Sequence, residues 1–213
     1  MANLPKQKNG DMELILVRHG ETTWNRERKV LGITDLELND TGRRQARQLA
    51  LSLKDHEIRR IYSSPLKRAY TTAEAINRFH GVPIRKRKGL MEMDSGDLEG
   101  LTMQELTAAG SDFLRRWMAD PATVRMPNGE SFIEVQERAW EALSDIIVRP
   151  ENALVVSHNF TIAAILCKIK GADLSHFRSS CVETASKTIV RFTNGTGRID
   201  LFNDRSHLGA DDL

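Results

Sequence analysis

Short strand-like segments followed at once by polar residues mark three places along the chain. Residues 14–17 and 153–156 are continuous apolar runs, which predict buried strands, and residues 58–62 predict another strand. The polar residues that follow these strands are Arg18 and His19, Ser63 and Ser64, and Ser157 and His158. Because ligands of open parallel sheets bind beyond the carboxyl ends of the strands, these positions predict a binding site.

Between the strands, apolar residues recur with the period of a helix. Helices are predicted from a cap at Asn39 through residue 54, over residues 66–79, from a capping box at Ser131 and Glu134 through residue 148, and over residues 159–170. Residues 102–120 suggest two short helices around Gly110, and residues 22–38, 91–100 and 121–130 read as loops. Near the C-terminus, strands at residues 188–192 and 198–202 form a predicted hairpin around residues 194–197.

The chain shows no internal repeat, low-complexity segment or linker that would divide it. We expect residues 1–10 to be a mobile leader and residues 11–208 to form a single domain. Within that domain, residues from about 100 to 130 are predicted to form a cap segment, and residues 209–213 are expected to be a tail.

Charge and composition exclude several classes of protein. With 31 basic and 29 acidic residues in 213, the chain has a net charge of +2 and lacks the strong positive charge that is typical of nucleic-acid-binding proteins. The basic run at residues 85–88 is expected to be a solvated edge, with a positive rim that attracts anions as the alternative. Cys167 and Cys181 do not make a disulfide framework, and no apolar stretch approaches the length of a membrane span or a signal peptide. The sequence therefore predicts a cytoplasmic protein with neither a membrane nor a nucleic acid as its partner.

The residues at the strand ends indicate the chemistry. An imidazole such as that of His19 can attack a phosphorus atom or move protons near neutral pH, and the planar fork of Arg18 matches phosphate or carboxylate oxygens. Arg68 follows a strand within the first turn of a predicted helix, and the amide of Asn159 begins another helix, which favours anions.

Taken singly, each of these residues has a structural alternative. A histidine that ends a strand is more often a structural residue than a catalytic one, and an arginine on a helix is usually solvated. Two histidines and two arginines at strand ends together favour an anion site, with His19 as the nucleophile and Arg18 holding a phosphate.

Four motifs in this order resemble those of the histidine phosphatase superfamily, the phosphoglycerate mutase-like group. They are LVRHGET at residues 16–22, SSPLKRAYTT at residues 63–72, Glu92 ahead of GDLEG at residues 96–100, and VSHN at residues 156–159. The resemblance covers nearly the whole chain. It implies an α/β fold, a three-layer α/β/α sandwich with a mostly parallel sheet.

The resemblance also implies a role for each residue that matches a family motif. His19 would carry the phosphoryl group, with Arg18, Arg68 and His158 lining the phosphate pocket, Asn25 as a further phosphate contact, and Glu92 as the proton donor. The expected activity is a metal-independent phosphomonoesterase acting on a small-molecule phosphate ester. Neither a metal site nor a cofactor is expected, since the six histidines lack metal-ligand spacing and no Gly-rich Lys loop is present.

The chemistry of phosphoryl transfer agrees with this set of residues. The reaction needs positive charge on the equatorial oxygens and a nucleophile in line with the leaving group, and the two arginines supply that charge without a metal. Neighbouring cations should keep His19 neutral and therefore nucleophilic.

Departures from the family pattern leave the substrate open. Met93 and Met103 replace an Arg and a Lys of the mutases, which disfavours a phosphoglycerate mutase. Among the phosphatases, the chain most resembles the α-ribazole phosphatases and the metal-independent phosphoserine phosphatases, although Ser95 stands where the latter have a His.

Three further residues are candidate substrate contacts, namely Leu31, Gly32 and His207. A phosphoglycerate mutase and a non-catalytic phosphoester-binding protein are kept as alternative functions, and a homodimer is left open.

Overall fold

A single six-stranded sheet organises the molecule, in the strand order β3-β2-β4-β1-β5-β6. The structure is a computed structural model that describes residues 11–108 and 112–212. The strands are β1 (Met12–Arg18), β2 (Arg60–Ser63), β3 (Ile84–Lys86), β4 (Ala153–Ser157), β5 (Lys187–Thr193) and β6 (Thr196–Asp204). Strands β1 to β4 run parallel, and β5 pairs antiparallel with both β1 and β6. The predicted α/β fold with a mostly parallel sheet is confirmed.

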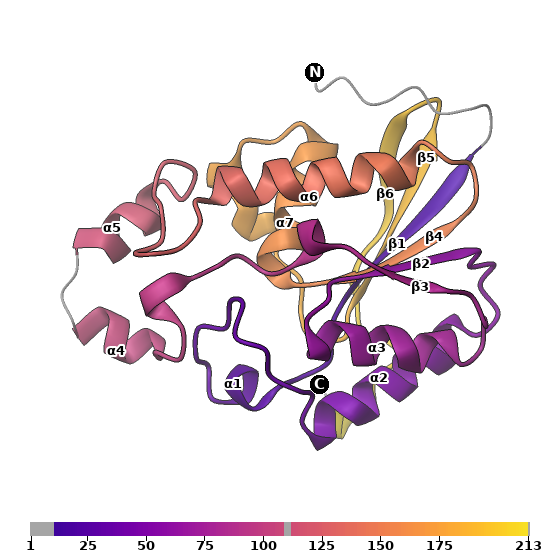
Figure 1. Cartoon of the computed structure of the whole chain (residues 1–213), viewed down its shortest axis with the longest axis horizontal. Helices are drawn as coiled ribbons and strands as arrows, with labels where there is room; N and C mark the ends of the chain where they lie inside the picture. The colour runs from indigo at the N-terminus through magenta and orange to yellow at the C-terminus, as the bar shows by residue number, and fades with distance from the viewer. Residues whose placement is uncertain (1–10, 109–111, 213) are drawn as a thin grey trace.

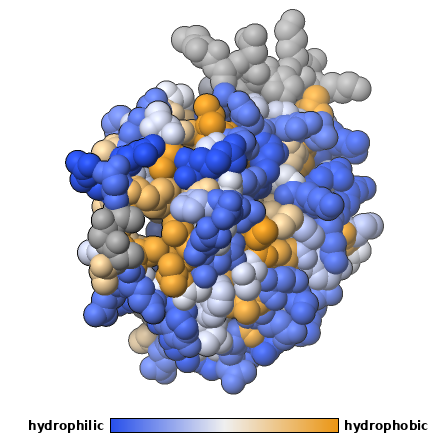
Figure 2. All heavy atoms as spheres, turned by 60° about the vertical axis from the view of Figure 1, so that its left-hand side comes forward, coloured by the Kyte–Doolittle hydropathy of each residue, from blue (hydrophilic) through white to orange (hydrophobic). Residues whose placement is uncertain are grey.

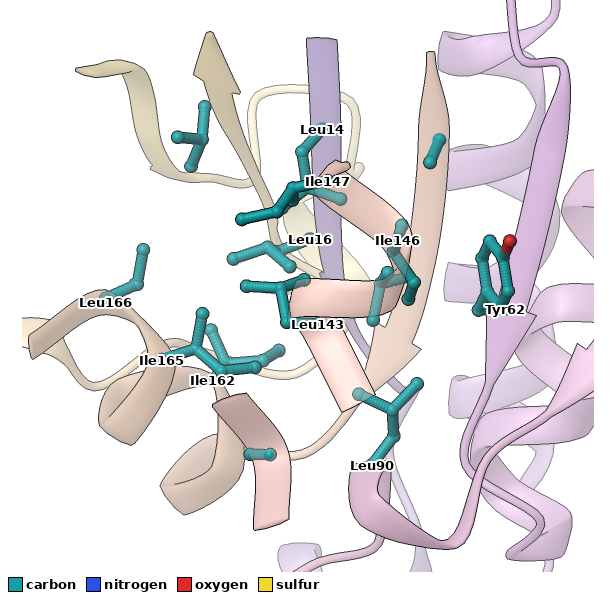
Figure 3. Close-up of a cluster of buried hydrophobic side chains, with 14 of the residues drawn as sticks. Leu14, Leu16, Tyr62, Leu90, Leu143, Ile146, Ile147, Ile162, Ile165 and Leu166 are labelled. Atoms are coloured by element: carbon teal, nitrogen blue, oxygen red, sulfur yellow. The ribbon is translucent and has the colours of Figure 1, made fainter. Parts of the chain in front are cut away.

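Helices cover both faces of the sheet, which confirms the expected three layers (Figure 1). One face carries α2 (Asp40–Leu53) and α3 (Lys67–Asn77), and the other carries α6 (Phe132–Ile147) and α7 (Asn159–Lys170). The side chains of β1 explain the two layers, because successive residues of a strand point to opposite faces. Ile15 and Val17 pack against α2 and α3, whereas Leu14 and Leu16 pack against α6 and α7 (Figure 3).

The register between β1 and β4 places the polar residues that follow them side by side. Arg18 pairs with Ser157 in this parallel ladder, so the next residue of each strand, His19 and His158, leaves the sheet at the same edge. The backbone amide of His19 donates to the carbonyl of Ser157 at 3.1 Å, which continues the ladder by one more bond. Strand β4 is fully buried and β1 is buried at residues 12 and 14–17, so this edge is held rigidly by the core.

Residues 100–108 and 112–130 project from one end of the molecule and include α4 (Met103–Ala108) and α5 (Asp112–Ala119) (Figure 1). Trp117 of α5 joins the rings of Phe132, Phe160 and Phe177 in one aromatic cluster, which attaches the segment to α6 and α7. The surface at this end mixes apolar side chains with hydrophilic ones (Figure 2).

The structure agrees closely with the predicted helix starts. Asn39 caps α2 through a bond from the amide of Gly42 at 2.8 Å, and Ser131 and Glu134 form the predicted capping box of α6. Helix α3 begins at Lys67 and ends at Asn77, within the predicted span of residues 66–79.

Short helices that the sequence pattern did not reveal lie in two of the expected loops, residues 22–38 and 91–100, and in three other segments. These are α1 (Thr23–Arg26) and the 3-10 helices η1 (Lys88–Leu90), η2 (Gly96–Leu98), η3 (Leu174–Ser180) and η4 (Ala210–Asp212). Such one- or two-turn elements depend on local caps and tertiary contacts rather than on an apolar period. Gly110 and the leader at residues 1–10 lie outside the described residues.

The basic run at residues 85–88 overlaps the end of the edge strand β3 and is exposed, as expected of a solvated edge. Lys86 lies 4.0 Å above the ring of Tyr70, and Arg85 and Arg87 lie over the ring of Tyr62. None of the helices in the described part of the chain is both long enough and apolar enough to cross a bilayer.

Candidate active site

Two imidazoles lie at the centre of the site. The ring centroids of His19 and His158 are 5.0 Å apart and their planes are tilted by 59°. Both side chains are buried, at 2% and 0% exposure. The parallel register of β1 and β4 is what brings together two residues that are 139 positions apart in the sequence.

One hydrogen bond decides which nitrogen of His19 can act as a nucleophile. Nδ1 lies 2.7 Å from the carbonyl oxygen of Gly20. A carbonyl can only accept, so Nδ1 carries the proton and Nε2 keeps its lone pair. Burial, followed by the charges of Arg68 and Arg18, holds the pKa of His19 well below its ordinary value, against the smaller opposing effect of the Gly20 carbonyl. His19 is therefore neutral at neutral pH, as the sequence analysis expected.

Gly20 makes this turn possible. A Cβ at this position would lie 2.5 Å from the carbonyl oxygen of Gly42 in the first turn of α2. The amide of Gly20 also donates to the hydroxyl of Thr72 on α3 at 3.2 Å. The turn after β1 is thus packed directly against α2 and α3, which fixes the carbonyl that orients His19.

Arg68 is held rigidly within the first turn of α3. Its side chain is fully buried, and its Nη1 and Nη2 donate to the carbonyls of Thr34 and Gly32 at 2.8 and 2.6 Å. Burial lowers the pKa of Arg68 to about 10, so the guanidinium stays charged at neutral pH. The prediction of an arginine at this strand end is confirmed in position, and the loop around Gly32 provides its support.

Arg18 is anchored through a chain of contacts that begins on α7. The side-chain oxygen of Asn159 accepts from the amide of Val182 at 2.8 Å, and the carbonyl of Val182 accepts from Nη1 of Arg18 at 2.6 Å. Burial lowers the pKa of Arg18, and the charge of Glu92 opposes that shift. Asn159 therefore contributes to the site through its side chain as well as through its place at the start of α7.

Several buried polar atoms of the residues that form this site lack a partner. Within residues 11–108 and 112–212, Nε of Arg18, Nε of Arg68 and both ring nitrogens of His158 are buried without a hydrogen bond. The pKa of His158 is lowered by burial first and then by Arg68, His19 and Arg18, which shows that these groups share one electrostatic environment. Leaving buried donors unpaired costs free energy, and an anion with several oxygens would satisfy them.

The carboxyl group of Glu92 lies at the N-terminus of α7. Its two oxygens accept from the amides of Phe160 and Thr161 at 3.2 Å each, from the hydroxyl of Thr161 at 3.3 Å, and from the amide of Met93 at 2.9 Å. The side chain is 5% exposed and interacts electrostatically with Arg18 and Arg68. Glu92 thus stands beside the cationic pocket, in the place that the resemblance requires of a proton donor.

Asn25 completes the capping box of α1, whose N-cap is Thr22. Its Oδ1 accepts from the amide and from the hydroxyl of Thr22, at 3.1 and 2.9 Å. This arrangement leaves Nδ2 as the side-chain donor for a ligand. Asn25 and Arg18 also line one wall of a pocket of about 240 Å³.

Comparison with known proteins agrees with this geometry. Residues 14–205 match the family model of the histidine phosphatase superfamily, branch 1. The chain belongs to the histidine phosphatase superfamily. The match includes each of the residues that the site brings together, from His19 to His158.

Three similar proteins illustrate the family. Phosphoserine phosphatase 1 of Hydrogenobacter thermophilus is 34% identical over 200 residues, which cover 93% of this chain and 95% of the relative. The uncharacterized phosphatase PhoE of Bacillus subtilis is 36% identical over 197 residues, covering 92% and 96%. The structure of Bacillus stearothermophilus YhfR superimposes with a TM-score of 0.86 at 33% identity, covering 92% of this chain and 98% of that one. The expectation of a hydrolase acting on phosphoric monoesters is confirmed at the level of the family.

The pocket next to Arg18 in this histidine phosphatase also contains residues that sequence reasoning missed. Its lining comprises Arg18, Glu21, Asn25, Gln45, Glu183, Thr184 and Arg205. Arg205 lies outside the motifs, and nothing in its local pattern distinguished it from a surface charge. Glu183 lies in residues 181–186, which resemble the phosphoserine phosphatases, but the sequence assigned it no role. Their placement became visible only with the fold.

The three candidate substrate contacts lie in different surroundings. Gly32 supports Arg68 through its carbonyl, and Leu31 precedes it in the same loop. His207 is half-buried, and burial followed by the charge of Lys187 lowers its pKa to about 4. Arg205, two residues earlier, is the residue of this segment that lines the pocket. Among the described residues, no group of three or more His, Cys, Asp or Glu side chains is arranged to hold a metal ion.

Proposed function

We propose that the chain is a metal-independent phosphomonoesterase that cleaves a small organic phosphate through a phosphohistidine at Nε2 of His19. The observation that carries this proposal is the state of His19, a buried neutral imidazole whose proton is fixed on Nδ1. The buried, unpartnered nitrogens of Arg18, Arg68 and His158 support it, because these three groups interact electrostatically and lack an acceptor.

In the first step, Nε2 of His19 attacks phosphorus while the bond to the leaving oxygen breaks. The charge on the three equatorial oxygens is stabilised by Arg18 and Arg68, with hydrogen bonds from His158, Asn25 and the backbone amide of Asn159. These groups are held in place before the substrate arrives, so little reorganisation is needed at the moment of reaction.

Glu92 supplies the proton that an alkoxide leaving group needs. The resulting carboxylate then takes a proton from a water molecule, which attacks the phosphohistidine, releases inorganic phosphate and restores His19. One carboxyl group thus serves as the acid in the first half of the cycle and as the base in the second.

The organic part of the ester extends into the polar pocket beside Arg18. Leu31, Gly32 and His207 stay proposed substrate contacts, and Arg205 and Glu183 join them as residues of the pocket wall. A pocket of both charge signs favours a small polar ester. The relative named phosphoserine phosphatase supports an ester of this kind.

A phosphoglycerate mutase is the less favoured activity. Met93, at a position where mutases carry a basic residue, is fully buried in an apolar cluster and offers no charge to a substrate carboxylate. A cytoplasmic location, a homodimer, and neither a nucleic acid nor a membrane as partner stay predictions of the sequence.

A phosphate-release assay over phosphoserine, α-ribazole phosphate, phosphoglycerates and p-nitrophenyl phosphate, with and without a chelator, tests the proposal. We expect hydrolysis that the chelator leaves intact and that His19→Ala lowers by on the order of 10³-fold or more. Labelled phosphate should be trapped on wild-type protein and not on His19→Ala. The exposed His176→Ala is the matched control and should keep full activity.

Three results would contradict the proposal. Turnover that survives His19→Ala would remove this residue from the chemistry. Conversion of 3- to 2-phosphoglycerate faster than phosphate release would indicate the mutase. Failure of every ester to label the protein would favour a non-catalytic phosphoester-binding protein.

A further inference from the structure

Arg138, on α6, uses its whole guanidinium group inside the protein. Nε and Nη2 donate to the two carboxylate oxygens of Glu130, at 2.8 and 2.9 Å. Nη1 donates to the carbonyls of Gly89 and Met91 at 2.9 and 2.8 Å, and Nη2 donates to the carbonyl of Glu92 at 2.9 Å. A guanidinium has five N–H donors, and here each has an acceptor.

These acceptors surround the segment that carries Glu92. Arg138 binds three carbonyls at residues 89, 91 and 92, and the carboxylate of Glu130 accepts from the amide of Asp94 at 2.9 Å. The Arg138–Glu130 pair therefore holds the backbone on both sides of the proposed proton donor. The pair is mostly buried, with side chains 23% and 26% exposed.

Other contacts tie the same segment to the end of β4 and to α7. The hydroxyl of Ser157 donates to the carbonyl of Leu90 at 2.7 Å, and that of Thr161 donates to the carbonyl of Met91 at 2.6 Å. Gly89 packs directly on α6, where a Cβ would lie 2.6 Å from the carbonyl oxygen of Arg138. The segment outside η1 has no strand partner, so these side chains replace the ladder that would otherwise fix it.

We propose that the Arg138–Glu130 pair is the positioning device for Glu92 and sets how well the leaving group is protonated. This inference rests on the proposed function, because it concerns the acid of the same reaction. Both residues contact the backbone of residues 89–94 rather than a side chain of the phosphate site, and the charge of Arg138, which Arg138→Lys keeps, also lowers the pKa of His158. A displacement of about 1 Å in a proton donor costs on the order of 10²-fold in rate, so a device of this kind has a measurable effect on catalysis.

The chemistry of arginine explains why this residue type is required. Only a planar fork can bind both oxygens of Glu130 and still direct the remaining N–H groups to three carbonyls. A lysine keeps the charge but offers three donors at a single point, which cannot reach all five acceptors. Arg138→Lys is therefore a conservative change in charge that should loosen the Glu92 segment.

The test compares two classes of ester by kcat/KM, which reports the steps up to phosphoryl transfer to His19. An alkyl ester such as phosphoserine needs a proton on its leaving oxygen, whereas p-nitrophenolate leaves without one. We expect Arg138→Lys to lower kcat/KM on the alkyl ester by about 10- to 100-fold and on p-nitrophenyl phosphate by less than about 3-fold. Arg125→Lys is the matched control, because Arg125 binds the carbonyl of Gly129 and the carboxylate of Glu134 without touching residues 89–94.

Glu130→Gln provides a second variant, which keeps the volume of the side chain and removes its charge. It should show the same selective loss, including where Arg138→Lys fails to fold by circular dichroism. An equal loss on both esters, or no loss in either variant, would overturn the inference.

The two proposals fail in different ways. If turnover does not depend on His19, the proposed function fails whatever Arg138 does. If turnover depends on His19 while both variants change kcat/KM equally for the two esters, the proposed function stands and the positioning role is wrong.

Discussion

The rings of His19 and His158 face each other with centroids 5.0 Å apart at the carboxyl ends of two adjacent parallel strands. After burial and Arg68, the charge of His19 lowers the pKa of His158, because two imidazolium ions at this distance would repel each other in a buried site. The charges of Arg18 and Arg68 act in the same direction. The pocket therefore holds its positive charge on arginines and keeps its imidazoles neutral, as a nucleophile and a hydrogen-bond donor require.

The first prediction concerns stability at acidic pH. Both histidines have folded-state pKa values well below 6.5, so as pH falls below 6.5 the unfolded chain binds protons that the folded protein does not. The free energy of unfolding should be constant with respect to these groups above pH 7. It should fall below pH 6.5 with a slope approaching about 1.4 kcal/mol per pH unit for each histidine.

Urea unfolding at pH 7.0 and 5.5 measures this effect. In His158→Gln the loss of stability between the two pH values should be smaller than in the wild type, because one of the two groups no longer titrates. The exposed His176→Gln is the control and should show the wild-type loss. Equal losses in all three proteins would show that His158 does not contribute.

Arg68 is the subject of the second prediction. Arg68→Gln removes a buried charge from the phosphate site and two bonds to the carbonyls of Gly32 and Thr34. We expect kcat/KM for p-nitrophenyl phosphate to fall by on the order of 10²–10³-fold and stability to fall by about 1–3 kcal/mol. The adjacent exposed Lys67→Gln, which changes charge equally, should leave kcat/KM within about 3-fold.

The same substitution should change the titration of His19. Arg68 is the largest charge that lowers the pKa of this histidine, second only to burial. NMR titration of the imidazole should therefore show a higher midpoint in Arg68→Gln than in the wild type. An unchanged midpoint would mean that burial and Arg18 keep His19 neutral without Arg68.

The motifs predicted the centre of the site because its residues sit where strands end. His19, Arg68 and His158 each follow a strand or open a helix, so a one-dimensional pattern of apolar runs was enough to locate them. The parallel register then brings His19 and His158 together, since it pairs Arg18 with Ser157.

The supporting residues could not be found in this way. Arg138 reaches Glu92 across 46 positions, and Arg18 reaches the carbonyl of Val182 across 164. Every residue has a backbone carbonyl, so the residue type at the acceptor position does not indicate which side chain will bind it. The amphipathic pattern of α6 even places Arg138 among its polar positions, where a solvated side chain is the ordinary interpretation.

Gly32 provides the third prediction. A Cβ there would lie 2.2 Å from Oε1 of Glu99, 2.6 Å from the carbonyl of Met93 and 2.8 Å from the amide of Ser95. Gly32→Ala must push apart two loops that are both joined to the site, one through Arg68 and the other through Glu92. We expect a loss of about 1–3 kcal/mol in unfolding free energy and a clear fall in kcat/KM.

Gly209→Ala is the control for this substitution. A Cβ at Gly209 would meet only the side-chain nitrogen of Gln48, at 3.7 Å, so stability and activity should both be preserved. Differential scanning calorimetry and the phosphate-release assay measure the pair. A Gly32→Ala protein as stable and active as Gly209→Ala would show that the two loops can move apart without loss of stability or activity.

The fourth prediction concerns Arg205 and the choice of substrate. Its guanidinium lines the pocket with Arg18 and is tied to the chain end by a bond from Nη2 to the carbonyl of Asp212 at 3.3 Å. In the proposed orientation of the ester, Arg205 faces the organic part, so it should attract esters that carry a second anionic group. Arg205→Gln should raise KM for phosphoserine and phosphoglycerates by about 10-fold and change KM for p-nitrophenyl phosphate by less than about 3-fold.

Arg198→Gln, on the exposed strand β6 and paired with Asp200, is the control and should leave both KM values unchanged. An equal rise in KM for all esters would place Arg205 at the phosphate itself. An unchanged KM for every ester would show that the organic part of the ester does not bind in this pocket.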